Sequence, residues 1–113
     1  MTTDAQALAT LIAKDEIRTL ALLYSRAIDR KDVALLRDLY TEDATDSHGD
    51  SFDGNQQDYC DFIERSLPYM PYSGHHACNH LIDVDVEAGK AAAKFMPLPG
   101  TRYQTERAAR WKT

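Results

Sequence analysis

The chain has 113 residues, of which 43% are hydrophobic and 27% are charged, and its formal net charge is −5. These values are ordinary for a globular protein and predict a single domain with one core. The acidic balance argues against nucleic-acid binding and against a basic membrane contact. No apolar run approaches the roughly 20 residues of a membrane span, and the start carries no secretory signal. We therefore expect a cytoplasmic protein whose two cysteines are free thiols.

The first third of the chain is predicted to be helical. Thr3 and Gln6 fit a capping box at the start of a long helix over residues 3–30, in which apolar side chains recur every three or four positions. Asp32 can cap a short second helix whose Leu36 faces inward. Two consecutive helices at the N-terminus are therefore expected.

The middle of the chain changes character. Residues 44–48 and 51–52 read as two short strands around a tight turn at residues 49–50. Asn55 is a typical residue for starting a further helix, and Pro68 should end that helix. A hairpin followed by a helix is therefore predicted here.

Residues 73–86 give the clearest strand pattern in the sequence. Alternate side chains of a strand point to opposite faces, and one face ends in β-branched residues while the other ends in Asp83 and Asp85. The predicted inward face comprises His76, Cys78, His80, Ile82, Val84 and Val86. An inward histidine suits general acid–base chemistry, although a packed core histidine is the alternative. Helices segregated from antiparallel strands predict an α+β fold.

Several motifs resemble the SnoaL-like families. They lie in the segments 24–32, 36–44, 46–49, 52–54 and 75–82, so that the resemblance covers about residues 15–85. It implies the nuclear transport factor two-type cone fold, in which N-terminal helices pack on a curved antiparallel sheet. Members include scytalone dehydratase, bile-acid dehydratases, polyketide cyclases and steroid isomerases, and many others only bind ligands.

The C-terminal segment departs from the family pattern. The single SnoaL-like domain should have its core at about residues 15–96, with an atypical tail at 97–113. Residues 91–96 are alanine-rich, and Pro97 and Pro99 should interrupt a strand ladder. Residues 102–103, 106–107 and 111–112 echo the last strand pair of the family. We expect an abbreviated C-terminus and a sheet too narrow to close the cone. A homodimer is also considered, although so narrow a sheet would not support association through the sheet.

The resemblance also implies a site. In scytalone dehydratase and its relatives an aspartate at the end of the first helix orients a histidine on the first long strand, and these positions fall on Asp29 and His76. A pocket aromatic falls on Tyr24, and an aromatic hydroxyl of the dehydratase falls on His48. We expect Tyr69, Tyr72 and His80 to join these as substrate-binding side chains. The alternatives are packing roles for the tyrosines, a solvated His48, and a surface ion pair between Asp29 and a nearby basic residue.

The predicted chemistry is that of a cofactor-independent lyase or isomerase. His76 would take a carbon-bound proton or supply one, and the Asp29 carboxylate would fix its tautomer. A tyrosine would stabilise the enolate. The substrate would be a small, partly apolar cyclic ketone or hydroxy compound, such as a polyketide or steroid.

Three other interpretations compete with this one. The chain could be a non-catalytic module that binds a small ligand or a subunit. A metal site could use His75, His76 and His80 with Asp46 or His48. However, His76 and His80 would lie roughly 13 Å apart on a strand, so no metal is expected. Cys78 reads as a small buried hydrophobe rather than a nucleophile.

Overall fold

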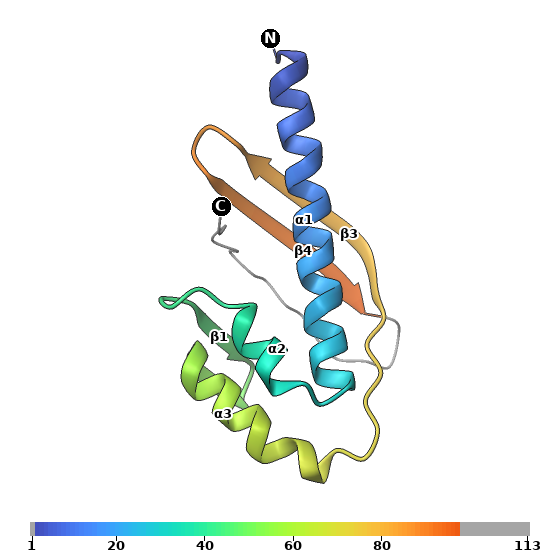
Figure 1. The fold of residues 1–113 in the computed structure, drawn as a ribbon, viewed down its shortest axis with the longest axis vertical. Coiled ribbons are helices and arrows are strands. Elements are labelled where there is room, and N and C mark those ends of the chain that lie inside the picture. The colour runs from blue at the N-terminus through green and yellow to red at the C-terminus, as the bar shows by residue number, and fades with distance from the viewer. Residues whose placement is uncertain (1, 98–113) are drawn as a thin grey trace. The chain divides into compact units, whose positions relative to one another are not determined.

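The computed structural model describes residues 2–97, and its chain forms two compact units. Among the described residues, the first unit contains 2–21 and 77–97, and the second contains 22–76. Helices and antiparallel strands make up both, so the α+β prediction is confirmed (Figure 1). No helix within residues 2–97 is long and apolar enough to cross a bilayer.

Helix α1 (Asp4–Asp29) begins in the first unit and ends in the second. Its start is the predicted capping box, in which the Thr3 backbone N–H donates to Gln6 Oε1 at 2.9 Å and the Gln6 N–H donates to Thr3 Oγ1 at 3.2 Å. The chain leaves the helix after Asp29, and Lys31 takes a positive φ of 56°. The last residue of α1 is therefore Asp29, which places a carboxylate at the end of the helix.

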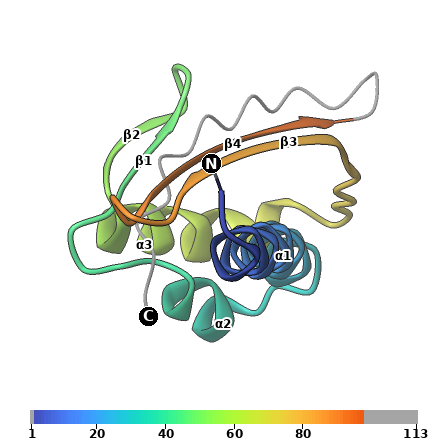
Figure 2. The same ribbon diagram turned by 90° about the horizontal axis from the view of Figure 1, so that it is seen from above.

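The first unit is a hairpin covered by the first part of α1. Strands β3 (Ala77–Asp85) and β4 (Lys90–Pro97) pair antiparallel, and the first part of α1 lies on one face of the pair (Figure 2). Ile17 of the helix packs with Ile82 and Ala93 of the strands, and all three are buried. The alanine-rich segment predicted to be a weak strand forms β4, and its Ala93 belongs to the buried cluster.

A bulge interrupts β3 and changes its side-chain phase. Cys78 pairs with Met96 and Leu81 pairs with Lys94, so Asn79 and His80 together face a single residue of β4. Asn79 has a φ of 51°, which asparagine tolerates better than most residues.

Two sequence predictions about this strand fail because the strand is shorter than expected at both ends. Ile82 is buried and Val84 is half-buried as predicted, but counting by twos does not carry across the extra residue. His76 lies before the strand begins at Ala77, and it is exposed instead of facing a core. Val86 lies in the turn after β3 and is also exposed.

The second unit contains α2 (Val33–Asp38), strands β1 (Thr45–His48) and β2 (Phe52–Asn55), α3 (Gln56–Ser66) and the short 3₁₀ helix η1 (Leu67–Tyr69). Its two helix starts follow the predicted caps. Asp32 Oδ1 accepts from the Leu35 N–H at 3.1 Å, and Asn55 Oδ1 accepts from the Asp58 N–H at 2.8 Å. The strands β1 and β2 form the predicted hairpin, with Gly49 at a φ of 54° in the turn.

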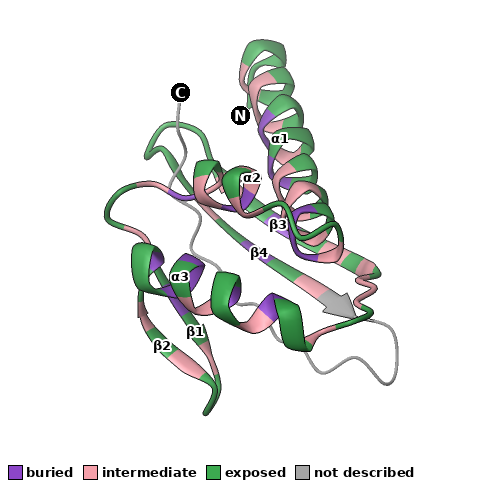
Figure 3. Ribbon diagram, turned by 60° about the horizontal axis from the view of Figure 1, so that its bottom comes forward, coloured by how far each residue is buried: buried purple, intermediate pink, exposed green. Residues whose placement is uncertain are grey.

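The core of the second unit lies between its helices and its hairpin. The buried residues of α3 follow one side of the helix (Figure 3). The buried cluster comprises Ala27, Ile28, Leu36, Tyr40, Tyr59, Cys60, Ile63 and Leu67. This core holds α1, α2 and α3 together and places tyrosines among aliphatic side chains.

The long strands of the described residues form a two-stranded sheet, which is short for a cone. The predicted atypical tail beyond Pro97, with its echoes of the last strand pair, lies outside the described residues.

Candidate functional site

The Asp29 carboxylate at the end of α1 is held by the loop that precedes β3. His75 Nδ1 lies 2.5 Å from Asp29 Oδ1, and the His75 backbone N–H donates to Asp29 Oδ2 at 2.9 Å. Ser73 Oγ donates to Oδ1 at 2.8 Å. The side chains of Asp29 and His75 are 22% and 15% exposed. Because a carboxylate only accepts, Nδ1 carries the proton and Nε2 is the nitrogen available for proton exchange.

These hydrogen bonds also set the charge of Asp29. Burial acts to raise the pKa of the Asp29 carboxyl, but hydrogen bonds from His75 and Ser73 outweigh it, so this pKa lies below its ordinary value. Asp29 is therefore an anion at neutral pH, as an orienting carboxylate must be.

Tyr24 lies against the other side of His75. The two rings meet edge to face with centroids 6.4 Å apart. Tyr24 and Asp29 are five residues apart, which on an ideal helix separates their directions by about 140°. They reach the same imidazole because α1 ends at Asp29.

A second group of polar side chains adjoins Tyr24. The Tyr24 hydroxyl lies 2.5 Å from the Tyr59 hydroxyl, and His48 Nε2 lies 3.5 Å and 3.4 Å from these two oxygens. His48 Nδ1 lies 2.5 Å from Asp46 Oδ1, and Tyr40 donates to Asp46 Oδ2 at 2.6 Å. The structure therefore brings Tyr24, Asp29 and His48 into one unit together with Tyr40, Asp46 and Tyr59.

His76 is not the partner of Asp29 in this arrangement. The carboxylate pairs with His75, the preceding residue, because residues 70–76 are not a strand and do not follow its alternation. The adjacent histidines at positions 75 and 76 indicate from the sequence that a site lies here. They do not indicate which of the two rings pairs with the Asp29 carboxylate. The surface ion pair considered for Asp29 gives way to the pairing with His75.

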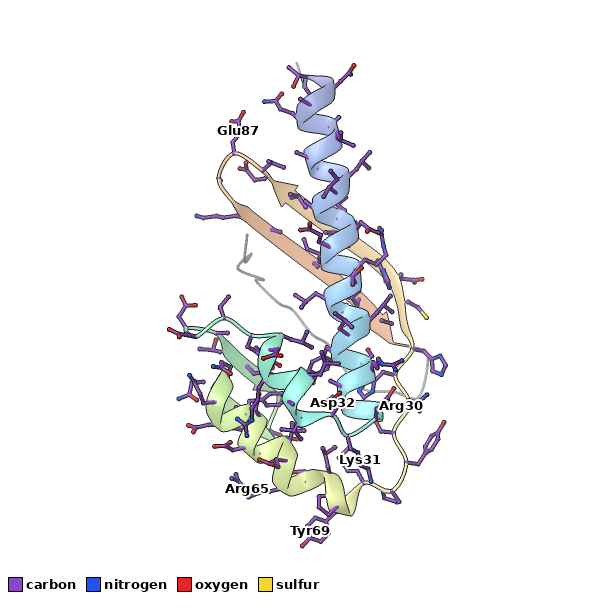
Figure 4. All side chains as sticks on the ribbon, viewed as in Figure 1. Arg30, Lys31, Asp32, Arg65, Tyr69 and Glu87 are labelled. Atoms are coloured by element: carbon purple, nitrogen blue, oxygen red, sulfur yellow. The ribbon has the colours of Figure 1, made fainter. Side chains whose placement is uncertain are left out.

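The remaining predicted substrate-binding residues lie elsewhere. Tyr69 and Tyr72 are 86% and 87% exposed, and Tyr69 projects away from the end of α3 (Figure 4). His80 belongs to the first unit, where Nε2 donates to the Ala77 carbonyl at 2.8 Å and the ring meets Phe95 edge to face. A substrate role for these three residues stays a prediction.

No three His, Cys, Asp or Glu side chains within residues 2–97 are grouped closely enough to hold a metal ion. The ligand set considered from the sequence is thus not assembled there.

His75 and Asp46 were considered from the sequence only as alternative metal ligands, and Ser73 and Tyr59 were not assigned to the site. Asp46 and His48 are two apart on a short strand, a spacing that places both on one face and was a readable signal. Ser73 and Tyr59 carried no such signal, because each reaches its partner across a long sequence separation.

Comparison with known proteins identifies the family. A model of the SnoaL-like domain matches residues 9–111 of the chain. The chain belongs to the SnoaL-like family. This SnoaL-like match extends beyond residues 15–85 at both ends and runs through both units. The fold family of SnoaL-like domains includes polyketide cyclases and isomerases. No curated protein and no solved structure matches the chain.

Proposed function

We propose that this SnoaL-like protein is a cofactor-independent lyase or isomerase that works by general acid–base catalysis. The substrate class is a small, partly apolar cyclic ketone or hydroxy compound, such as a polyketide or steroid. The observation that carries the proposal is the pairing of His75 Nδ1 with the Asp29 carboxylate at 2.5 Å. A carboxylate on Nδ1 leaves Nε2 basic in the neutral ring and stabilises the imidazolium that proton uptake creates.

The proposed reaction begins with removal of a proton from the carbon next to the substrate carbonyl. His75 Nε2 takes this proton, and the electron pair of the broken C–H bond forms the enolate. Tyr24 lies against the His75 ring and donates a hydrogen bond to the enolate oxygen. Return of the proton to another carbon gives isomerisation, whereas transfer to a leaving hydroxyl gives dehydration.

A non-catalytic ligand-binding module is the second candidate from the sequence. A module of that kind has no need of an oriented imidazole, and Asp29 would be expected to face solvent. Instead Asp29 accepts three hydrogen bonds from one loop. This arrangement supports the acid–base proposal over the binding module.

Deuterium uptake tests the proposal without knowledge of the natural substrate. A panel of monocyclic and bicyclic ketones with acidic α-hydrogens is incubated with the protein in D₂O, and mass spectrometry measures exchange at carbon. The matched pair of variants is His75→Gln and His76→Gln, with circular dichroism to verify folding. We expect His75→Gln to slow exchange by about 10²–10⁴-fold and His76→Gln to retain it.

Two outcomes would contradict the proposal. Equal exchange rates in the wild type and in His75→Gln would remove the base from the mechanism. Loss of exchange in His76→Gln with retention in His75→Gln would assign the base to the other histidine.

A further inference from the structure

A second carboxylate–imidazole pair, Asp46 and His48, lies on β1. Asp46 Oδ1 is 2.5 Å from His48 Nδ1, and the two side chains are 4% and 15% exposed. The neighbours Thr45 and Ser47 point outward, as expected for a strand with one buried face. This pair is thus at least as well buried as Asp29 and His75.

Both oxygens of the Asp46 carboxylate are engaged. Tyr40, which follows the C-cap of α2, donates its hydroxyl to Oδ2 at 2.6 Å, while Oδ1 faces His48. A buried carboxylate is costly unless it is satisfied, and here the Tyr40 hydroxyl donates to it while His48 Nδ1 lies at ion-pair distance from its other oxygen. The Tyr40 hydroxyl therefore fixes the carboxylate that fixes the His48 ring.

The opposite nitrogen of His48 faces two phenols. Nε2 lies 3.4 Å from the Tyr59 hydroxyl and 3.5 Å from the Tyr24 hydroxyl, which are themselves 2.5 Å apart. The His48 and Tyr59 rings stack with centroids 4.8 Å apart and an interplanar angle of 11°. A short path of hydrogen-bonding atoms thus joins Asp46 to the hydroxyl of Tyr24.

Tyr24 connects this path to the first pair. Its ring contacts His75, the base of the proposed function, and its hydroxyl belongs to the His48 group. Burial raises the pKa of Tyr59, so this phenol stays neutral and its proton remains available for hydrogen bonding. A proton can therefore reach the Tyr24 oxygen from His48, directly or through Tyr59.

We propose that Asp46 and His48 form the acid side of the site, opposite the base side formed by Asp29 and His75. His48 acts through Tyr24 and supplies its proton, and Asp46 is a positioning residue that holds His48 and stabilises its charged form. The inference rests on the proposed function, because it assigns the source of the proton that the substrate oxygen receives.

The proton balance is as follows. The substrate C–H bond breaks, its proton goes to His75 Nε2, and its electron pair moves into the carbonyl to give the enolate. The enolate oxygen takes the proton of the Tyr24 hydroxyl and becomes an enol. Tyr24 regains a proton from protonated His48 at Nε2. His75 has then gained one proton and His48 has lost one, and proton exchange with water returns both rings to their starting protonation states.

The inference predicts a change in the shape of the pH profile. Titratable groups that contact His48 include Asp46 on β1, Tyr24 on α1 and Tyr59 on α3. Enolisation needs a neutral His75 together with a protonated His48, so the rate should fall at both low and high pH. Removal of the acid side should abolish the fall at high pH, whereas a purely structural change should lower the whole profile evenly.

The test uses deuterium exchange into the same panel of cyclic ketones, measured across pH in the wild type and four variants. Asp46→Asn keeps the shape of the side chain, His48→Gln removes the imidazole, and His75→Gln removes the base. Asp53→Asn on β2 is the matched control, because it makes the same chemical change at an exposed position of the hairpin. Circular dichroism verifies the folding of each variant.

We expect His48→Gln and Asp46→Asn to slow exchange on the order of 10²-fold near neutral pH. His48→Gln should also lose the fall at high pH, whereas Asp46→Asn keeps the imidazole and should retain that fall at a lower rate. Asp53→Asn should match the wild type. Tyr59→Phe, which removes one oxygen, is the second test if Asp46→Asn fails to fold. It should slow exchange but retain the fall at high pH, because His48 Nε2 still faces the Tyr24 hydroxyl.

The outcomes separate the inference from the proposed function. Exchange that is lost in His75→Gln but keeps its rate and pH profile in His48→Gln and Asp46→Asn overturns the acid side and leaves the base intact. Exchange that is unaffected by His75→Gln, or absent from the wild type with every ketone, overturns the proposed function and the inference with it.

Discussion

Asp29 illustrates how a single residue joins two distant parts of the chain. Its carboxylate accepts from the hydroxyl of Ser73 and from the ring and backbone of His75, which lie 44 and 46 residues further along. Such hydrogen bonds favour the charged carboxylate over the neutral acid. The stability of the protein should therefore depend on the ionisation of this group.

Replacement of Asp29 by Asn should destabilise the protein at neutral pH and have less effect in acid. The pKa of Asp29 is lowered in the folded state, so its contribution is present above the unfolded value of about 3.9 and is lost as the pH falls through the folded pKa. Urea unfolding at pH 7, 4 and 3 should show the difference between wild type and Asp29→Asn shrinking with pH. An equally large difference at pH 3 would contradict this.

Tyr59 should make the protein sensitive to alkali. Burial raises the pKa of its hydroxyl, whereas the unfolded chain releases this proton near pH 10. Stability should therefore fall as the pH rises above about 10, because the unfolded state then binds fewer protons than the folded state.

Urea unfolding of Tyr59→Phe tests this expectation. The variant should lose about 1 kcal/mol at neutral pH through the missing hydrogen bond, yet show a smaller further loss between pH 8 and 10.5. Tyr69→Phe alters a side chain that is 86% exposed, and it should follow the wild type. A full alkaline loss in Tyr59→Phe would show that another group is responsible.

At the scale of the element, capping residues position the helices that carry the site. Asn55 ends β2 and caps α3, and Tyr59 follows one turn later. On β3 a bulge at Asn79 changes which side chains face inward. Both features are local. The cap at Asn55 follows a known sequence pattern, whereas the bulge at Asn79 does not.

Replacement of Asn55 by Ala should lower the free energy of unfolding by about 1 kcal/mol, because the Asp58 N–H loses its acceptor. Asn55→Asp retains a side-chain oxygen and is the matched control, with stability close to that of the wild type. Urea unfolding measures both. Equal losses in Asn55→Ala and Asn55→Asp would show that the cap is not the cause.

At the scale of the whole molecule, the described residues contain two separate buried clusters. Ile17, Ile82 and Ala93 form the cluster of the first unit, and the larger cluster surrounds Leu36 and Tyr59 in the second. The candidate site lies beside the larger cluster, since Tyr40 and Tyr59 belong to both. The rigidity of the site should therefore depend on that core.

Replacement of Leu36 by Ala should cost about 2–5 kcal/mol, because the side chain is 1% exposed and its removal leaves a cavity. Leu22→Ala makes the same chemical change in the same unit at a position that is 53% exposed, and it should change stability by less than about 0.5 kcal/mol. Urea unfolding compares the two. Similar losses in both variants would contradict the assignment of this core.

Much of the local structure and the family could be predicted from the sequence. The capping box at Thr3, the caps at Asp32 and Asn55 and the turn at Gly49 depend on contacts within about four residues, so a short pattern contains the necessary information. The same holds for the end of α1, which places Asp29 where a carboxylate can leave the helix.

The composition of the site required the three-dimensional structure. Whether His75 or His76 meets Asp29 depends on the path of a loop without regular alternation, and the pairing of Tyr24 with Tyr59 spans 35 residues. Tyr69 and Tyr72 have the same chemistry as Tyr24, yet they are exposed, and their backbone lies at the end of η1 and in the following loop. Hydrogen bonds between residues close in sequence follow from local backbone geometry. Hydrogen bonds between residues distant in sequence depend on how the helices, strands and loops pack together in the folded chain.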